Sequence, residues 1–393
     1  MSHSFVYTCT PKSCERSPSM SIRTSQNPTP GTAAGSPGRW NRLVGSIVEA
    51  ALSPHPVDRY LELLDPMLTW RDLRGEIVRV EHPTPRTVRL TIRPTRQWRG
   101  HQAGQFVQLS VVIDGVRHTR CFSPANAAAG PDGDIELTIT ANDDGLVSKH
   151  LAAEARTGDV VGLSQADGEF ALPETDPTSA VFISGGSGVT PVLSMLRTLV
   201  ARDYAGPITF VHYARTASEV AYRTELAALA VEHPNLDLRM HHTREEDNGH
   251  FTAAHLDDIP GLADADVFVC GPRALMNAVA EAHAELGISQ PLHSEAFTLA
   301  APTVVDPDSV EGELTFSRSG ATATNDGRPI LDQAEAAGLT PESGCRMGIC
   351  FSCTAVKKSG CTRNVLTGET DTESDTQIQL CINAPVGSVD IEI

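Results

Sequence analysis

The sequence lacks the features of a secreted, membrane-spanning or nucleic-acid-binding protein. Its first residues show no basic start followed by an apolar stretch, and no run of ~18 apolar residues occurs, so neither a secretion signal nor a spanning helix is expected. Basic residues are few: 31 Lys and Arg stand against 49 Asp and Glu, for a formal net charge of −18. This acidic balance argues against nucleic acid as the main partner. It is compatible with docking on a basic partner and also with simple solubility.

A disulfide framework is also absent. The nine cysteines are unevenly spaced, and an odd number in a chain without a secretion signal predicts reduced thiols. Together with the missing spanning segment, this predicts a cytoplasmic protein.

The chain is long enough for two or three domains, and its composition changes along its length. Residues 1–39 are rich in Ser, Thr, Pro and Gly and predict a disordered tail, whereas residues 40–73 predict a helical N-terminal extension. The apolar face of such an extension usually packs on a neighbouring domain; docking on a partner or a membrane surface is the alternative. For the remaining segments, the sequence predicts an antiparallel β-barrel (74–175), an α/β doubly wound domain (176–300), a linker (301–312) and a small C-terminal domain (313–393).

Two kinds of periodicity support this division. Short apolar strands separated by Gly- and Pro-bearing turns, such as Val88–Ile92, are typical of an antiparallel barrel. From Ala180 onward, predicted strands alternate with predicted helices at Val192–Val200 and Ser218–Ala230. This alternation predicts a parallel sheet covered by helices.

The most specific motif lies in the C-terminal segment. Cys345, Cys350 and Cys353 have the spacing C-x4-C-x2-C, and Cys381 follows at a distance, which is the arrangement of plant-type 2Fe–2S sites. Zinc is the alternative, but structural zinc sites usually pair two short knuckles, and here the fourth cysteine stands alone. Cys361 fits no ligand position and is interpreted as a packing residue. The segment resembles plant-type ferredoxins over its whole length, which implies an α+β β-grasp domain holding a 2Fe–2S cluster.

A candidate flavin site begins at Arg120-Cys121-Phe122-Ser123. The motif offers a cation for the flavin phosphate, an aromatic face for the ring and a hydroxyl for a hydrogen bond near the reacting nitrogen. A second element is Gly145-Leu-Val147-Ser148, which opens a predicted helix and could seat a pyrophosphate at its N-terminus. Taken alone, Arg120 could be a surface charge and Ser148 a plain N-cap.

Together these motifs resemble the ferredoxin–NADP reductase superfamily, an antiparallel flavin barrel followed by a nicotinamide domain. The resemblance implies that Arg120 holds the flavin phosphate, that Phe122 stacks near the ring, and that Ser123 hydrogen-bonds near flavin N5. Because residues 145–148 offer a pyrophosphate seat, FAD is expected, with FMN as the alternative.

A candidate nicotinamide site combines two strand-end motifs. Gly185-Gly186-Ser-Gly188-Val-Thr190 follows a predicted strand and opens a helix, so its backbone can approach a pyrophosphate. Cys270-Gly271-Pro272 follows a later strand of the same sheet. The resemblance implies that Thr190 and Cys270 flank the nicotinamide and, with Ser123, form the catalytic set; a packing role is the alternative for Cys270. It also places Glu295 and Phe297 near the flavin.

NADPH is favoured over NADH as the electron donor. A 2′-phosphate requires positive charge, and Arg215 follows a predicted strand end while Arg223 lies on the next predicted helix. Either arginine could instead be solvated.

The domain order predicts an electron-transfer enzyme. Hydride from NADPH would reduce FAD, and the 2Fe–2S cluster would pass electrons singly to an iron-containing, oxygen-activating partner. The stretch Val57–Pro66, with the domain order, resembles the actinobacterial reductase partner of membrane acyl-CoA desaturases. This implies electron transport for fatty acid desaturation, or for an alkane hydroxylase, with peripheral membrane contact through the partner. The alternatives are a reductase for a soluble aromatic-ring or haem oxygenase and a redox-sensing protein.

Overall fold

The computed structural model describes residues 57–143, 145–245, 249–288, 290–296, 310–344, 346, 348 and 351–393. The predicted tail, most of the N-terminal extension and most of the linker therefore lie outside the described residues. Within the described residues, no helix is both long enough and apolar enough to cross a membrane.

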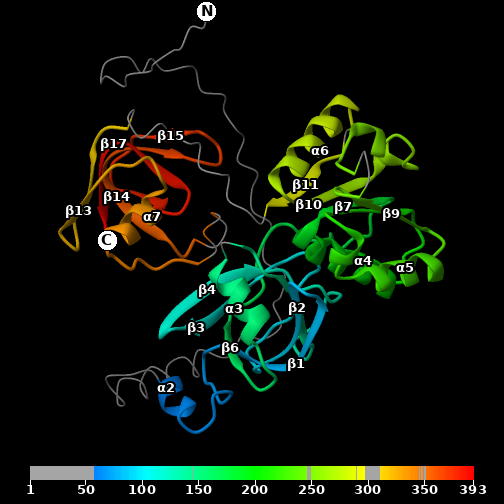
Figure 1. Cartoon of the computed structure of the whole chain (residues 1–393), viewed down its shortest axis with the longest axis horizontal. Helices are drawn as coiled ribbons and strands as arrows, with labels where there is room; N and C mark the ends of the chain where they lie inside the picture. Colours follow the sequence, from blue (N-terminus) through cyan, green and yellow to red (C-terminus); the bar gives the residue numbers. More distant parts are fainter. Residues whose placement is uncertain are drawn as a thin grey trace, which may run out of the picture. The chain divides into compact units, whose positions relative to one another are not determined.

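An antiparallel six-stranded sheet forms the first part (Figure 1). Its strand order is β4-β3-β6-β1-β2-β5, and it closes into a barrel where the Ala125 N–H donates to the Glu136 carbonyl at 2.8 Å. Alternate residues of β2, namely Val88, Leu90 and Ile92, are fully buried, as expected for a strand with one face on a core. The elements are β1 (Arg74–Thr84), β2 (Thr87–Pro94), β3 (Val107–Ile113), β4 (Val116–Phe122), β5 (Ile135–Thr140), α3 (Leu146–Glu154) and β6 (Val160–Leu163).

The described end of the N-terminal extension is attached to this barrel. Helix α2 (Val57–Glu62) places the carboxylate of Asp58 where it accepts backbone N–H bonds from Trp70, Arg71 and Asp72. Helix α2 ends at Glu62 although the helical extension was expected to continue to residue 73, and Leu63 and Leu64 are more than 80% exposed.

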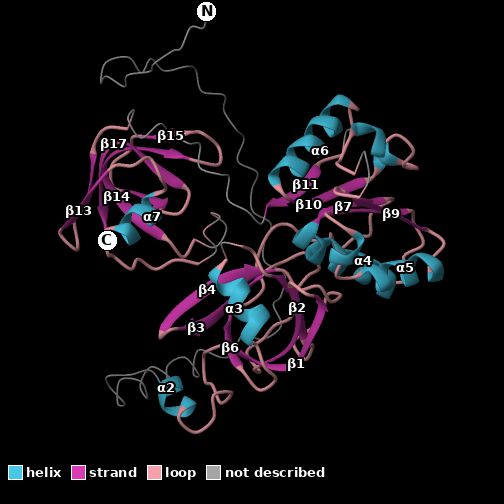
Figure 2. Cartoon of the chain, in the orientation of Figure 1, coloured by secondary structure: helices cyan, strands magenta, loops and turns pink. Residues whose placement is uncertain are grey.

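A parallel five-stranded sheet follows, with the order β11-β10-β7-β8-β9. Figure 2 shows α4 and α5 on one side of it and α6 on the other. Two cores match these layers, because alternate strand residues such as Phe182 and Val181 point to opposite faces. The elements are β7 (Ala180–Gly185), η1 (Gly186–Gly188), α4 (Val189–Ala201), β8 (Ile208–Ala214), η2 (Ala217–Glu219), α5 (Arg223–Glu232), β9 (Leu236–His242), η3 (Ala253–His255), η4 (Leu262–Asp264), β10 (Asp266–Gly271), α6 (Arg273–Glu285) and β11 (Leu292–Ala296). The doubly wound arrangement predicted from the sequence is confirmed.

Barrel and parallel sheet meet through a buried charge network. Arg197 of α4 donates to Glu136 of β5 at 2.9 Å and forms a two-pronged pair with Glu225 of α5, both bonds being 2.7 Å. Tyr222 donates to Glu136 at 3.0 Å, and its ring contacts the guanidinium groups of both Arg197 and Arg89. Although burial opposes ionisation, Glu225 and Glu136 raise the pKa of Arg197, so its guanidinium remains charged.

The C-terminal part is a mixed sheet with one helix. Strand β12 pairs antiparallel with β13 and parallel with β17, and β17 pairs antiparallel with β14. Helix α7 packs on the sheet and contributes Ile330, Leu331 and Ala334 to the core. The elements are β12 (Glu313–Phe316), β13 (Ala321–Thr324), α7 (Ile330–Ala336), β14 (Thr354–Asn364), β15 (Thr370–Asp371), β16 (Thr376–Gln379) and β17 (Asn383–Glu392).

Candidate active site

The glycine-rich turn lies against the end of β10. Gly188 packs so closely that a Cβ at this position would lie 2.2 Å from the Cys270 carbonyl oxygen, so only glycine fits. Gly186 has a φ of +56°, which also favours glycine. The hydroxyl of buried Thr190, in the first turn of α4, donates to the Ser187 carbonyl at 3.3 Å. In this first turn the Val189 N–H donates to the Gly186 and Ser187 carbonyls and Pro191 has no N–H, so α4 attracts an anion mainly through its helix dipole.

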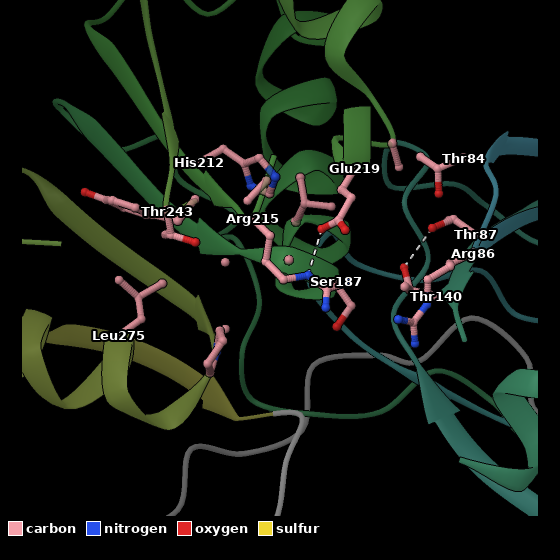
Figure 3. Close-up of a pocket in the computed structure, with 18 of the residues that line it drawn as sticks. Thr84, Arg86, Thr87, Thr140, Ser187, His212, Arg215, Glu219, Thr243 and Leu275 are labelled. Carbon is pink, nitrogen blue, oxygen red and sulfur yellow. Dashed lines mark hydrogen bonds and ion pairs between the residues drawn. The ribbon is translucent and has the colours of Figure 1, made fainter. Parts of the chain in front are cut away.

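A cavity of about 950 Å³ opens at this turn (Figure 3). Gly185, Gly271 and Pro272 of the predicted motifs line it, together with residues at the carboxyl end of β8. The opposite wall comes from the barrel, at the β1–β2 turn and the segment after β5. Carboxyl strand ends of an open parallel sheet are the usual place for a bound nucleotide.

Two buried polar groups on the predicted reacting side have no partner within the described residues. One is the Oγ atom of Ser123, whose residue is 2% exposed, and the other is the Oε2 atom of Glu295. Strand pairing places Glu295 directly beside Cys270, which is fully buried. Because unpaired buried polar atoms are costly, these groups are suited to hydrogen-bond a bound cofactor.

Burial controls the protonation of this pair. It raises the pKa of the Glu295 carboxyl to about 8, and burial followed by the charge of Glu295 raises the pKa of the Cys270 thiol. At neutral pH, Glu295 is therefore a proton donor rather than a carboxylate.

We expect the stability contributed by Glu295 to decline between pH 4.5 and pH 8. The folded pKa lies above the ordinary value of 4.5, so the stabilising effect is complete below pH 4.5 and is lost as the pH approaches 8. Relative to Glu295→Gln, the native protein should lose several degrees of melting temperature over this range and no more above it. Thermal unfolding of both proteins from pH 5 to 9.5 tests this, and parallel curves would show that the carboxyl has an ordinary pKa.

The first three residues of the predicted flavin motif form the end of β4, and Ser123 follows that strand. Arg120, Cys121 and Phe122 pair with Leu109, Gln108 and Val107 of β3. The Arg120 guanidinium donates to the Thr119 carbonyl at 2.7 Å, and Phe122 packs on the barrel core.

The residues of the second flavin motif, at the start of α3, differ in their structural surroundings. Gly145 is the N-cap, and the Ser148 hydroxyl accepts the Asn142 N–H at 3.1 Å, so this hydroxyl already organises the loop. The Val147 side chain is buried in the barrel core, which leaves only its backbone for a ligand. A phosphate here would be held mainly by backbone N–H groups.

The two predicted arginines lie in different places. Arg215 lines the cavity, and its Nε donates to Glu219 at 2.7 Å. Arg223 is the exposed first residue of α5 and is not among the lining residues, so the structure does not bring it to the cavity. Phe297, Cys345 and Cys350 lie outside the described residues.

Sequence reasoning missed His212. It lines the cavity, and its Nδ1 lies 2.8 Å from the Ser184 hydroxyl on β7. Burial, with a smaller effect of His242, lowers the pKa of His212 to about 4, so the ring is neutral at pH 7. In the sequence, only the position of His212 near a strand end could have indicated that it lines the cavity.

Comparison with known proteins agrees with this geometry. Residues 78–172 match the oxidoreductase FAD-binding domain, and residues 182–281 match the oxidoreductase NAD-binding domain. An NADPH oxidoreductase of Mycobacterium tuberculosis is 33% identical over 377 residues, which are 95% of this chain and 97% of that relative. The chain belongs to the ferredoxin–NADP reductase superfamily. It is an NAD(P)H-dependent oxidoreductase with FAD- and NAD(P)H-binding domains.

Two further relatives of this oxidoreductase extend over most of its length. The stachydrine N-demethylase reductase subunit of Rhizobium meliloti is 30% identical, covering 74% of this chain and 88% of the relative. Phthalate dioxygenase reductase, described as a modular structure for electron transfer from pyridine nucleotides to a 2Fe–2S centre, has a TM-score of 0.61. At 24% identity, covering 82% of this chain and 98% of that one, it establishes the fold. The predicted reductase superfamily is therefore confirmed.

Proposed function

We propose that the oxidoreductase passes electrons from NADPH through FAD and a C-terminal 2Fe–2S cluster to an oxygen-activating partner. The observation that carries this proposal is the position of Cys353 and Cys381, two thiols from separate segments of the C-terminal sheet. They are 3% and 2% exposed, and the Leu380 N–H donates to the Cys353 carbonyl at 3.0 Å. The cysteine spacing supplies the other two ligands, Cys345 and Cys350.

The described parts of the cysteine loop support a cluster site. Gly348 has a φ of +79° and packs against Ile382, next to Cys381, and its carbonyl accepts a bond from the Gln379 side chain at 2.7 Å. Arg346 and Phe351 also have positive φ values, of +60° and +55°. Positive-φ residues in a loop change the direction of the backbone N–H groups, and N–H groups gathered on one side suit sulfur atoms of negative charge.

The mixed sheet with a single packed helix supports a β-grasp ferredoxin domain. Arg346 of the cysteine loop pairs with Asp332 at 3.5 Å and with Glu335, both on α7. The helix thus braces the loop that would hold the cluster. Zinc remains the alternative for the same thiols, and the two metals have different visible spectra.

For the flavin, Arg120 and the N-terminal amides of α3 would hold the phosphates of FAD. Phe122 would lie near its ring, and Ser123 would supply the hydrogen bond that its unpaired hydroxyl offers. When bound, FAD accepts a hydride and releases electrons singly.

For NADPH, the α4 N-terminus would bind the pyrophosphate and Arg215 the 2′-phosphate, while Thr190 and Cys270 would border the nicotinamide. Glu295, neutral at pH 7, would keep charge away from the reacting end. The M. tuberculosis relative is named as an NADPH oxidoreductase, which agrees with this donor.

For the partner, two observations lead to related proposals. The stretch Val57–Pro66 resembles reductases of membrane acyl-CoA desaturases, which favours a desaturase or alkane hydroxylase and a cytoplasmic protein that meets the membrane through its partner. The relative named as the reductase subunit of stachydrine N-demethylase favours a reductase component of a multi-subunit enzyme, and a soluble aromatic-ring or haem oxygenase is the corresponding alternative acceptor. Electron transfer within this chain is the same in both, so a coupled assay with each acceptor distinguishes them.

Anaerobic titration of the purified protein with NADPH, and separately with NADH, tests the internal relay. We expect both the flavin bands and the iron–sulfur bands of the visible spectrum to bleach, with NADPH the more efficient donor. Flavin bleaching without any iron–sulfur spectrum would contradict the cluster. A cluster that is reduced but never passes electrons to an acceptor would instead favour a redox sensor.

A further inference from the structure

The barrel contributes a cation to the cavity wall. Arg86 is the second residue of the two-residue turn between β1 and β2 and lines the cavity. Its Nη2 atom donates to the Ala141 carbonyl at 2.8 Å and to Asp143 Oδ1 at 2.5 Å. Among the described residues, its Nε and Nη1 atoms have no partner. The guanidinium is therefore held in place on one side and unpaired on the other.

Arg215, on the wall formed by the parallel sheet, is also held by a carboxylate on one side only. Its Nε atom is paired with Glu219, and its two Nη atoms have no partner among the described residues. Figure 3 shows Arg86 on the barrel side and Arg215 on the sheet side of the cavity, with Ser187 between them in this view. Each arginine is thus oriented by a carboxylate of its own domain.

The chemistry of the pair indicates a phosphate ligand. Guanidinium groups with several unpaired N–H donors bind phosphate oxygens in forked geometry. Asp143 and Glu219 line the same cavity and offset the charge of the two arginines, so an anion would be bound mainly by the unpaired N–H donors at close range. The adjacent α4 N-terminus adds the positive end of its helix dipole.

We infer that Arg86 binds a phosphate of the nicotinamide nucleotide, so that the flavin-binding barrel itself takes part in nucleotide binding. The inference rests on the proposed assignment of this cavity to NADPH. A nucleotide held by Arg86 and Arg215 bridges the two domains, and its binding favours their docked arrangement. Two groups have the required chemistry, the 2′-phosphate and the pyrophosphate.

Binding of NADP⁺, 2′,5′-ADP and ADP to the FAD-loaded protein tests the inference by calorimetry. Arg86→Gln should weaken binding of NADP⁺ about tenfold, the usual effect of losing one charge-assisted bond. A loss for 2′,5′-ADP alone identifies the 2′-phosphate, and an equal loss for ADP identifies the pyrophosphate. Asp143→Asn is the matched control: it breaks the same ion pair but leaves the cation, so affinity should stay equal or increase.

Unchanged affinity in Arg86→Gln would overturn the inference. Equal weakening in Asp143→Asn and Arg86→Gln would also overturn it, because it would show that Arg86 only stabilises the turn. Arg215→Gln separates this failure from that of the proposed site. If Arg215→Gln weakens NADP⁺ binding and Arg86→Gln does not, only the role of Arg86 is wrong. If neither does, the nucleotide binds elsewhere and both proposals are wrong.

Discussion

Replacing Cys381 by serine should remove the one-electron output of the enzyme and leave flavin reduction intact. Cys381 is 2% exposed in the C-terminal core, whereas the flavin and nicotinamide motifs lie in other sheets. Mutation of a residue that supports a metal ligand typically lowers metal affinity roughly 10- to 100-fold. Loss of a ligand itself should lower cluster occupancy by at least this factor. NADPH-dependent reduction of cytochrome c should fall with it. Reduction of ferricyanide, which accepts electrons from flavin directly, should persist.

Cys361→Ser is the matched control for this experiment. Cys361 lies in β14 of the same sheet, is half-buried, and fits no ligand position in the motif. Its replacement should leave both activities and the iron–sulfur spectrum unchanged, whereas Cys350→Ser should behave like Cys381→Ser. Equal loss of cytochrome c and ferricyanide reduction in Cys381→Ser would show that the C-terminal domain is needed for the flavin site to form.

Sequence periodicity predicted the sheets well because their strands are buried in regular patterns. All residues of β8 (Ile208–Ala214), for example, are buried, and such apolar runs are typical of a parallel sheet. Helix boundaries were predicted less well. The helix expected at Val192–Val200 begins at Val189, because Pro191 lies in the first turn, where its missing N–H needs no acceptor. Strand β4 was not recognised around Arg120 because its polar residues show no clear alternation.

Tertiary contacts explain the differences in the site. The helix expected at Ser218–Ala230 is divided, since Tyr222 is buried against Glu136 of the barrel and α5 begins only at Arg223. That break keeps Arg223 away from the cavity. Arg86 belongs to no motif, and its turn reaches the cavity only because the barrel packs beside the parallel sheet. Glycine and cysteine motifs are local and can be read from spacing, whereas ion pairs across domains depend on the fold.

Arg197→Met should destabilise the enzyme more than any other single charge removal at the interface between barrel and parallel sheet. The substitution leaves Glu136 and Glu225, whose side chains are 21% and 34% exposed, without their shared cation. Removing one partner of a buried pair costs roughly 3–5 kcal/mol, and the residual exposure favours the lower end. A loss of about 3 kcal/mol corresponds to a decrease in melting temperature of roughly 6–12 °C.

Arg202→Met provides the comparison, because Arg202 directly follows α4 and pairs with Asp176 at the surface, where the side chains are 37% and 39% exposed. Surface pairs contribute roughly 0–1 kcal/mol, so this variant should melt within a few degrees of the native protein. NADPH oxidation should also separate the two variants, because Arg197, unlike Arg202, connects α4 to the Glu136 side chain of β5 and to the Ala125 carbonyl of the barrel. Similar melting temperatures for both variants would show that the network around Tyr222 contributes no more than a surface ion pair. A normal rate of NADPH oxidation in Arg197→Met would show that Tyr222, the apolar contacts of α4 and the hydrogen bonds of Ser194 and Thr198 to the barrel are sufficient to hold the flavin and nicotinamide domains in their working arrangement.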